Sequence, residues 1–170
     1  MRASVKPAST ALCAATALGL NACGDGDVVR VQDPVEVSYT VVAQSGSYGS
    51  TAGVQYTLVR SQTELANLFY AIDQSSAAPP VVDFSREYAY LATPGPRGSP
   101  GYGVSVKAVR RIPVGQMDAL DIDIETSSPG SGCIYPQVVM APYVIISFSR
   151  DALTSGIVNT NIAEVVRKCG

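Results

Sequence analysis

Apolar and polar residues alternate along much of the chain, with the period typical of β-strands that bury one face. The clearest case is residues 35–41, where valine and tyrosine at odd positions alternate with polar residues at even positions. Gly46, Gly49 and Gly53 follow and are expected to mark turns. Similar runs rich in Val, Ile and Tyr predict further strands at residues 54–60, 81–84, 88–92, 102–111, 119–126 and 137–148.

One segment has the pattern of a helix instead. Ser61 and Glu64 have the spacing of a capping box, and apolar residues follow at helical intervals, namely Leu65, Leu68, Phe69 and Ile72. The two prolines at 79 and 80 cannot continue a helix and end the segment. Residues 157–168 fit either a helix beginning at Asn161 or a strand, and the pattern does not decide between them.

These elements predict the fold class. A single helix cannot provide the crossover connections that several parallel strands require, so the strands are expected to be antiparallel. We therefore expect a mainly β protein of the α+β class, a small sandwich or rolled sheet with one helix packed on it. Residues 35–170 are expected to form a single globular domain.

Residues 1–22 have the composition of an export signal. Arg2 and Lys6 precede an apolar run at residues 11–20, which is shorter than the roughly 20 residues of a membrane-spanning helix. Residues 20–23 (LNAC) then resemble the lipobox of bacterial lipoproteins, in which the cysteine is lipidated and becomes the first residue. We expect lipid on Cys23, a flexible tether over residues 23–34, and a location in the bacterial envelope, at the outer membrane facing the periplasm or the surface. The alternative is an ordinary secreted protein cleaved nearby.

The cysteines fit an exported protein. Of the four in the chain, Cys13 would leave with the signal and Cys23 would carry the lipid. Cys133 and Cys169 remain as a pair in an oxidising compartment. We expect them to form a disulfide that fixes the end of the chain.

Charge and composition exclude several functions. The chain has 12 basic and 14 acidic residues, and loss of Arg2 and Lys6 with the signal changes the net charge from −2 to 10 − 14 = −4. The absence of a basic cluster argues against nucleic-acid binding. The absence of histidine removes the commonest general base and the commonest transition-metal ligand, so triad hydrolases and histidine-based zinc enzymes are excluded. No cofactor is expected.

Two groups of residues nevertheless resemble catalytic or metal sites. Asp121, Asp123 and Glu125 alternate with apolar residues and so share one face of a strand, where they are either a carboxylate site or, as we favour, a solvated face that resists edge pairing. Ser131 lies between glycines but lacks the spacing of a nucleophile elbow and a base to activate it. We assign no metal site and no catalytic residue.

The most unusual stretch is the Pro/Gly-rich segment 95–103 (GPRGSPGYG). Its prolines donate no N–H and it leads into a strand, which argues against phosphate binding. It is either a plain hairpin connection or an exposed recognition loop. In the second case Arg97 and Tyr102 would contact a partner, with Tyr143 expected nearby.

Three segments resemble a known family in the same order along the chain: residues 82–87 (VDFSRE), the 95–103 loop running into residues 102–106 (YGVSV), and residues 141–146 (APYVII). They are similar to the C-terminal domain of PrcB, a lipoprotein subunit of a bacterial surface protease complex. The resemblance covers about residues 81–149. Pro100 and Gly101 stand where the family has paired glycines, and the cysteine pair is not part of the family pattern.

The resemblance implies a non-catalytic accessory protein that binds and stabilises an envelope protein such as a protease. Three other functions remain open. One is direct protease inhibition, by analogy with chagasin-type inhibitors. The second is a structural envelope lipoprotein, and the third is an enzyme that uses Asp121, Asp123 and Glu125.

Overall fold

The computed structural model describes residues 33–48, 50–114 and 117–169. Cys23 and the expected signal and tether lie outside these ranges, apart from residues 33 and 34. The elements are β1 (Val35–Glu36), β2 (Tyr39–Tyr48), β3 (Gln55–Val59), α1 (Gln62–Ile72), β4 (Glu87–Thr93), β5 (Gly103–Val114), β6 (Met117–Pro129), β7 (Met140–Ser149), a short 3-10 helix η1 (Arg150–Ala152) and β8 (Ile157–Arg167). No helix within the described ranges is both long and apolar enough to span a bilayer.

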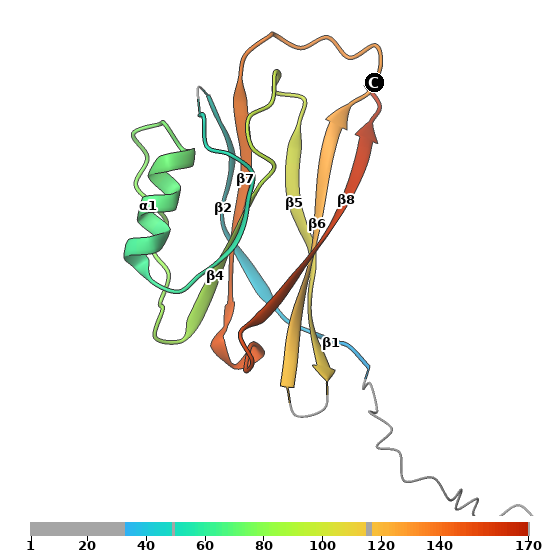
Figure 1. The fold of residues 1–170 in the computed structure, drawn as a ribbon. Coiled ribbons are helices and arrows are strands. Elements are labelled where there is room, and N and C mark those ends of the chain that lie inside the picture. Colours follow the sequence, from blue (N-terminus) through green and yellow to red (C-terminus); the bar gives the residue numbers. More distant parts are fainter. Residues whose placement is uncertain (1–32, 49, 115–116, 170) are drawn as a thin grey trace, which may run out of the picture.

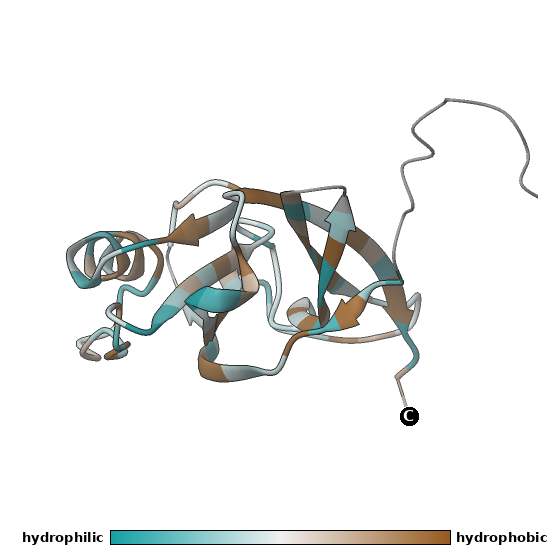
Figure 2. Cartoon of the chain, turned by 90° about the horizontal axis from the view of Figure 1, so that it is seen from below, coloured by the Kyte–Doolittle hydropathy of each residue, from teal (hydrophilic) through white to brown (hydrophobic). Residues whose placement is uncertain are grey.

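The strands form two four-stranded sheets that pack face to face, with α1 as a third layer (Figure 1). One sheet has the order β1-β5-β6-β8 and the other the order β2-β7-β4-β3. Seen from below, α1 lies to one side of the two sheets (Figure 2). The expected mainly β sandwich with one packed helix is confirmed.

The core between the sheets is aliphatic and aromatic. Inward-facing residues of β5 and β6 meet those of β4 and β7, and Tyr90, Ile122, Ile146 and Phe148 are at most 1% exposed. The register of β5 against β6 shifts between Val106 and Ala108, and both Val106 and Val109 are buried. A bulge of this kind keeps apolar side chains on the inner face where strict alternation would turn one outward.

A second cluster lies between α1 and the outer face of the β4–β7 sheet. Leu65, Phe69 and Ile72 of α1 pack there against Leu91 and Ile145. The predicted capping box is present, because Ser61 Oγ accepts a hydrogen bond from Glu64 N at 3.2 Å, and Glu64 Oε2 accepts one from Arg60 N at 2.9 Å. The sequence therefore located this helix correctly.

The prediction of one strand over residues 35–41 was wrong. The chain leaves the first sheet after β1 and enters the second as β2, so residues 37 and 38 cross between the sheets. The crossing stays bonded to β5, since Val37 N donates to Val109 O at 2.8 Å and Tyr39 Oη donates to Val106 O at 3.1 Å. The turn expected at Gly46 was also wrong, because Gly46 lies within β2 and pairs with Pro142.

The strand predicted at residues 81–84 does not form, because residues 81–83 have no regular secondary structure and lead into a turn at 84–86. Asp83 organises it: the carbonyl of Asp83 accepts hydrogen bonds from the N–H groups of Arg86 and Glu87, and its side chain accepts one from Ser85 N at 3.0 Å. Asp side chains favour such turns over extended structure. The buried Val82 packs in the cluster beneath α1.

The ambiguous C-terminal segment is a strand. β8 pairs in parallel with β6 from Ala119↔Ile157 to Pro129↔Arg167, an exception to the antiparallel arrangement that was expected. The connection between them passes through β7 of the opposite sheet, so this parallel pair needs no crossover helix. The pairing makes β6 an interior strand.

The structure joins Cys133 and Cys169, with Cα atoms 5.5 Å apart and a sequence separation of 36 residues. The bond links the turn after β6 to the residues after β8, where Gly130 N also donates to Arg167 O at 2.9 Å. It therefore fixes the C-terminal end of an edge strand that would otherwise fray.

Replacing both cysteines by alanine should lower the free energy of unfolding by about 2 to 5 kcal/mol, because the unfolded chain regains the freedom of that loop. Urea unfolding of the mature protein measures the change. Reduction should destabilise the wild type and leave the double variant unaffected. Free thiols at both positions in protein isolated from its native envelope would contradict the prediction.

Candidate functional site

The segment 94–102 connects β4 in one sheet to β5 in the other, so it is a crossover between sheets and not the hairpin that was considered. It is firmly attached to the start of β7. Arg97 N donates to Met140 O at 2.7 Å and Met140 N donates to Arg97 O at 2.9 Å. Gly95 has φ of 78°, and a Cβ there would lie 3.1 Å from Val54 N, so this position requires glycine.

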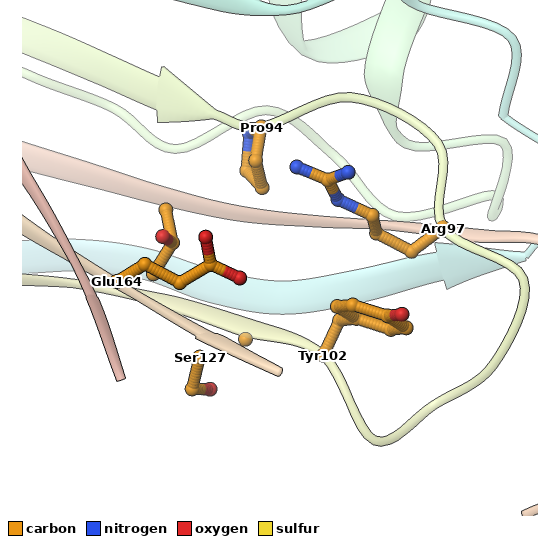
Figure 3. Close-up of a pocket in the computed structure, with 7 residues that line it drawn as sticks. Pro94, Arg97, Tyr102, Ser127 and Glu164 are labelled. Atoms are coloured by element: carbon orange, nitrogen blue, oxygen red, sulfur yellow. The ribbon is translucent and has the colours of Figure 1, made fainter. Parts of the chain in front are cut away.

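The loop covers a notch at one end of the sandwich (Figure 3). The guanidinium of Arg97 lies over the ring of Tyr102, 5.6 Å from its centroid, in the geometry of a cation–π contact. The carboxylate of Glu164 on β8 extends into the notch from the opposite side (Figure 3). The space is about 100 Å³, and the residues around it are Pro94, Arg97, Tyr102, Gly103, Thr126, Ser127 and Glu164.

The polar groups of this notch have few partners within the protein. In the described part of the chain the ion pairs are Lys107–Glu125, Arg110–Asp123 and Arg111–Asp118, and none involves Arg97 or Glu164. The buried Oγ of Ser127 also has no hydrogen-bond partner among the described residues, but this side chain is directed away from Arg97 and Tyr102 (Figure 3). A positive group, a negative group and an aromatic ring are thus held around one small opening.

A second hollow, of about 250 Å³, adjoins the notch and shares Tyr102 with it. Its other side is formed by the segment that follows β6 and includes Cys133 and Tyr135. This segment exposes apolar side chains, since Ile134 is 97% exposed and Val139 52%. Local sequence pattern did not indicate this surface, because its Val-rich end was assigned to the strand predicted at 137–148.

Tyr143 does not belong to this site. It is 3% exposed and lies on the face of β7 that packs under α1, where its hydroxyl donates to Asp73 Oδ2 at 2.7 Å. Burial, and then the bond to Asp73, raise the pKa of Tyr143. The expectation that Tyr143 stands beside the loop was wrong.

The three carboxylates of β6 lie on the outer face of their sheet and do not converge. Glu125 pairs with Lys107 at 3.0 Å, Asp123 pairs with Arg110, and Asp121 accepts a hydrogen bond from Asn159 Nδ2 at 2.8 Å. The hydrogen bond from Asn161 and then the ion pair with Arg110 lower the pKa of Asp123, while burial opposes them.

These carboxylates therefore form ion pairs and hydrogen bonds on the outer face of the sheet. The expectation that they prevent edge pairing was wrong, because β6 is an interior strand. Ser131 is exposed in a turn. Within residues 33–48, 50–114 and 117–169, no three His, Cys, Asp or Glu side chains are placed to hold a metal ion.

Residues 89–149 match the family described as PrcB C-terminal. This part of the chain is PrcB C-terminal-like. No curated protein and no solved structure matches the chain. The expected resemblance is confirmed, although residues 82–87, which suggested it in part, precede the matched region.

The PrcB C-terminal-like region runs from β4 to the end of β7. It contains Arg97 and Tyr102 together with Met140, which holds the loop in place. Glu164 and Cys169 come from outside the region, so β8 and its disulfide complete the notch from elsewhere in the chain.

The contact between Tyr143 and Asp73 predicts a pH-dependent stability. Burial raises the pKa of Asp73, but hydrogen bonds from Ser75, Tyr143 and Ser47 outweigh it and leave this pKa lowered. A carboxyl group with a lowered pKa in the folded state stabilises the fold above its unfolded pKa, about 3.9, and loses that effect as the pH falls through the folded value.

Tyr143→Phe should therefore lower the free energy of unfolding by about 2 kcal/mol at neutral pH and reduce the loss of stability on acidification. Urea unfolding at pH 7 and pH 3 measures both effects. Tyr70→Phe, at a position 55% exposed, is the control and should change neither. Unchanged stability of Tyr143→Phe with lost partner binding would instead place Tyr143 in a binding surface.

Proposed function

We propose that this protein is an exported, lipid-anchored accessory protein that binds and stabilises an envelope protein, such as a protease, through the Arg97–Tyr102 loop. The observation that carries the proposal is the Arg97 guanidinium, which is held over Tyr102 on an anchored loop and has no acidic partner among the described residues. The PrcB C-terminal match supports an accessory role and includes this loop.

The loop has the chemistry of a protein-binding surface. Arg and Tyr are among the residues that contribute most binding energy at protein interfaces, and they do so best when a pocket fixes their position. Both hydrogen bonds to Met140 hold Arg97 in place before any partner arrives. A loop that is already ordered loses little conformational entropy on binding.

The position of the loop suits a tethered protein. The chain enters the domain at β1, which pairs with β5 near its far end, where Glu36 is opposite Arg110. The loop meets β5 at the other end, at Gly103 (Figure 1). Gly103 and Arg110 are seven residue steps apart along the strand, or roughly 23 Å at about 3.3 Å per residue. A tether leading to Cys23 would therefore leave the loop facing away from the membrane.

The proposed anchor predicts the behaviour of a Cys23→Ala variant expressed in a lipoprotein-exporting bacterium. Without the sulfur that accepts lipid, the protein should leave the membrane fraction, whereas the wild type stays with it and gains the mass of the lipid. Fractionation and mass spectrometry of the N-terminal peptide measure both properties. A wild-type N-terminal peptide without lipid would contradict the anchor.

The proposed recognition loop predicts that Arg97→Ala and Tyr102→Ala each weaken partner capture by about tenfold or more, as loss of an interface anchor does. Crosslinking in the native envelope, followed by pull-down, measures capture per folded molecule. Arg86→Ala and Tyr70→Ala, both at exposed positions beyond the loop, are the matched controls.

Tyr102→Phe keeps the ring under Arg97 and should retain most of the binding. Normal capture by both alanine variants would place the recognition surface elsewhere. Recovery of no protein partner by the wild type, in repeated trials, would refute the binding function itself.

A further inference from the structure

Among the described strands, β8 lies at the edge of its sheet and pairs with β6 alone. Its eleven residues keep one register throughout, without a bulge, proline or glycine. Other edges in the described part of the chain are less regular or shorter: β2 has a register shift between Val41 and Ala43, β3 has five residues and β1 has two. Long regular edges are the ones to which a further strand can be added.

The face of β8 that is directed toward the opposite sheet is only partly covered. Val158 packs on the core, and the Thr160 hydroxyl shares a hydrogen bond with Tyr90 at 2.5 Å. Alternation places Ile162, Glu164 and Val166 on the same face. Yet Ile162 is 52% exposed and Val166 68%, so this half of the strand lacks the apolar cover that the first half has.

The backbone of the same residues is directed to the free edge. The carbonyl of Arg167 accepts from Gly130 N, and that of Ala163 accepts from Thr126 Oγ1 at 3.4 Å, so both are directed toward β6. Peptide groups along a strand alternate between its two sides, which directs those of Ile162, Glu164 and Val166 away from β6. A strand added there would pair with these groups and could cover Ile162 and Val166.

Charge at the end of β8 indicates the chemistry of a segment that could bind there as an added strand. β8 ends at Arg167, whose guanidinium extends across β6 toward Gly103. Lys168 follows the strand, and Arg97 lies across the notch that Glu164 lines. None of these three cations is in an ion pair within the described ranges. In a protein of negative net charge, this end carries an excess of positive charge and is complementary to an acidic segment.

A second copy of the chain fits less well. Two β8 strands related by a two-fold axis would pair antiparallel and direct their β1 ends in opposite directions. In two copies anchored as proposed above, both β1 ends would have to face the same membrane, which this arrangement prevents. An extended segment of another protein has no such constraint.

We propose that β8 binds an extended segment of the partner protein as an added antiparallel strand, with aliphatic residues at alternate positions and acidic residues at its N-terminal end, beside Lys168. The inference rests on the proposed function and specifies how the same partner is held. Main-chain hydrogen bonds to β8 would supply affinity, and contacts with Ile162 and Val166 would supply specificity.

Site-specific photocrosslinking of the full-length lipoprotein in its native envelope tests this inference. A photoreactive phenylalanine analogue is placed in turn at residues 162, 164 and 166, with position 102 reporting on the loop and position 81 as the exposed control. Mass spectrometry then locates the crosslinked residues. Strand addition predicts one contiguous segment, in which each two-residue step along β8 shifts the crosslink by two residues in the opposite direction.

Val166→Lys and Ile162→Lys should reduce crosslinking from position 164 by about tenfold, because each places an unpaired charge where the added strand would bury it. Val81→Lys, at a position 86% exposed on the helix side, is the matched control and should have no effect. Thermal unfolding of each variant identifies any that fails to fold.

The outcomes separate the two proposals. Crosslinks from position 102 but none from β8 would overturn strand addition and leave the loop as the binding surface. Crosslinks from β8 to β8 of a second copy would replace the partner segment with a homodimer. No partner crosslink from either surface would refute both proposals, and a segment without the predicted register or acidic end would refute strand addition as stated.

Discussion

The fold depends on the burial of β7 on both faces. Nine of its ten residues are buried, with Tyr143 and Ile145 under α1 and Val144 and Ile146 in the core between the sheets. Such a strand must have a layer on each side, and its two neighbours, β2 and β4, must cover its hydrogen-bonding edges. The three-layer arrangement follows from this one strand, and the bridge from Met140 at its start fixes the Arg97 loop to it.

The outer face of the other sheet is stabilised differently. There polar side chains of β5, β6 and β8 contact one another: Lys107, at the bulge of β5, pairs with Glu125, and Asn161, which is opposite Asp123 in the register, donates to it. Exposed ion pairs contribute little free energy each, so this ladder chiefly selects the register of a parallel pair. The same asparagines explain why β8 is a strand, since Asn159 and Asn161 bond side chains of β6 and do not cap a helix.

Much of the fold could be predicted from local pattern, and the errors have specific causes. Strands β3, β4 and β5 and helix α1 were found because alternation or capping is a property of neighbouring residues. The change of sheet at residues 37–38 leaves alternation intact on both sides and so leaves no trace in sequence. Residues 81–84 were predicted as a strand because they form a short apolar run, but hydrogen bonds to Asp83 form a turn there instead. Alternation along β7 does not indicate which face packs on the helix, so the position of Tyr143 under α1 was not predicted. Glu164 was missed because its segment fitted both helix and strand.

The two sides of the candidate site are held in place by different interactions. The loop and the start of β7 lie in the PrcB C-terminal-like region, and their position is set by paired backbone hydrogen bonds. Glu164 is contributed by β8, which pairs on one side only among the described strands, and whose end is fixed by the Cys133–Cys169 bond. The disulfide constrains the end of β8 without covering its free edge, so it can hold that edge in extended form while leaving its backbone groups available. A surface of this kind is ordered before binding, which lowers the entropic cost of recognising a partner.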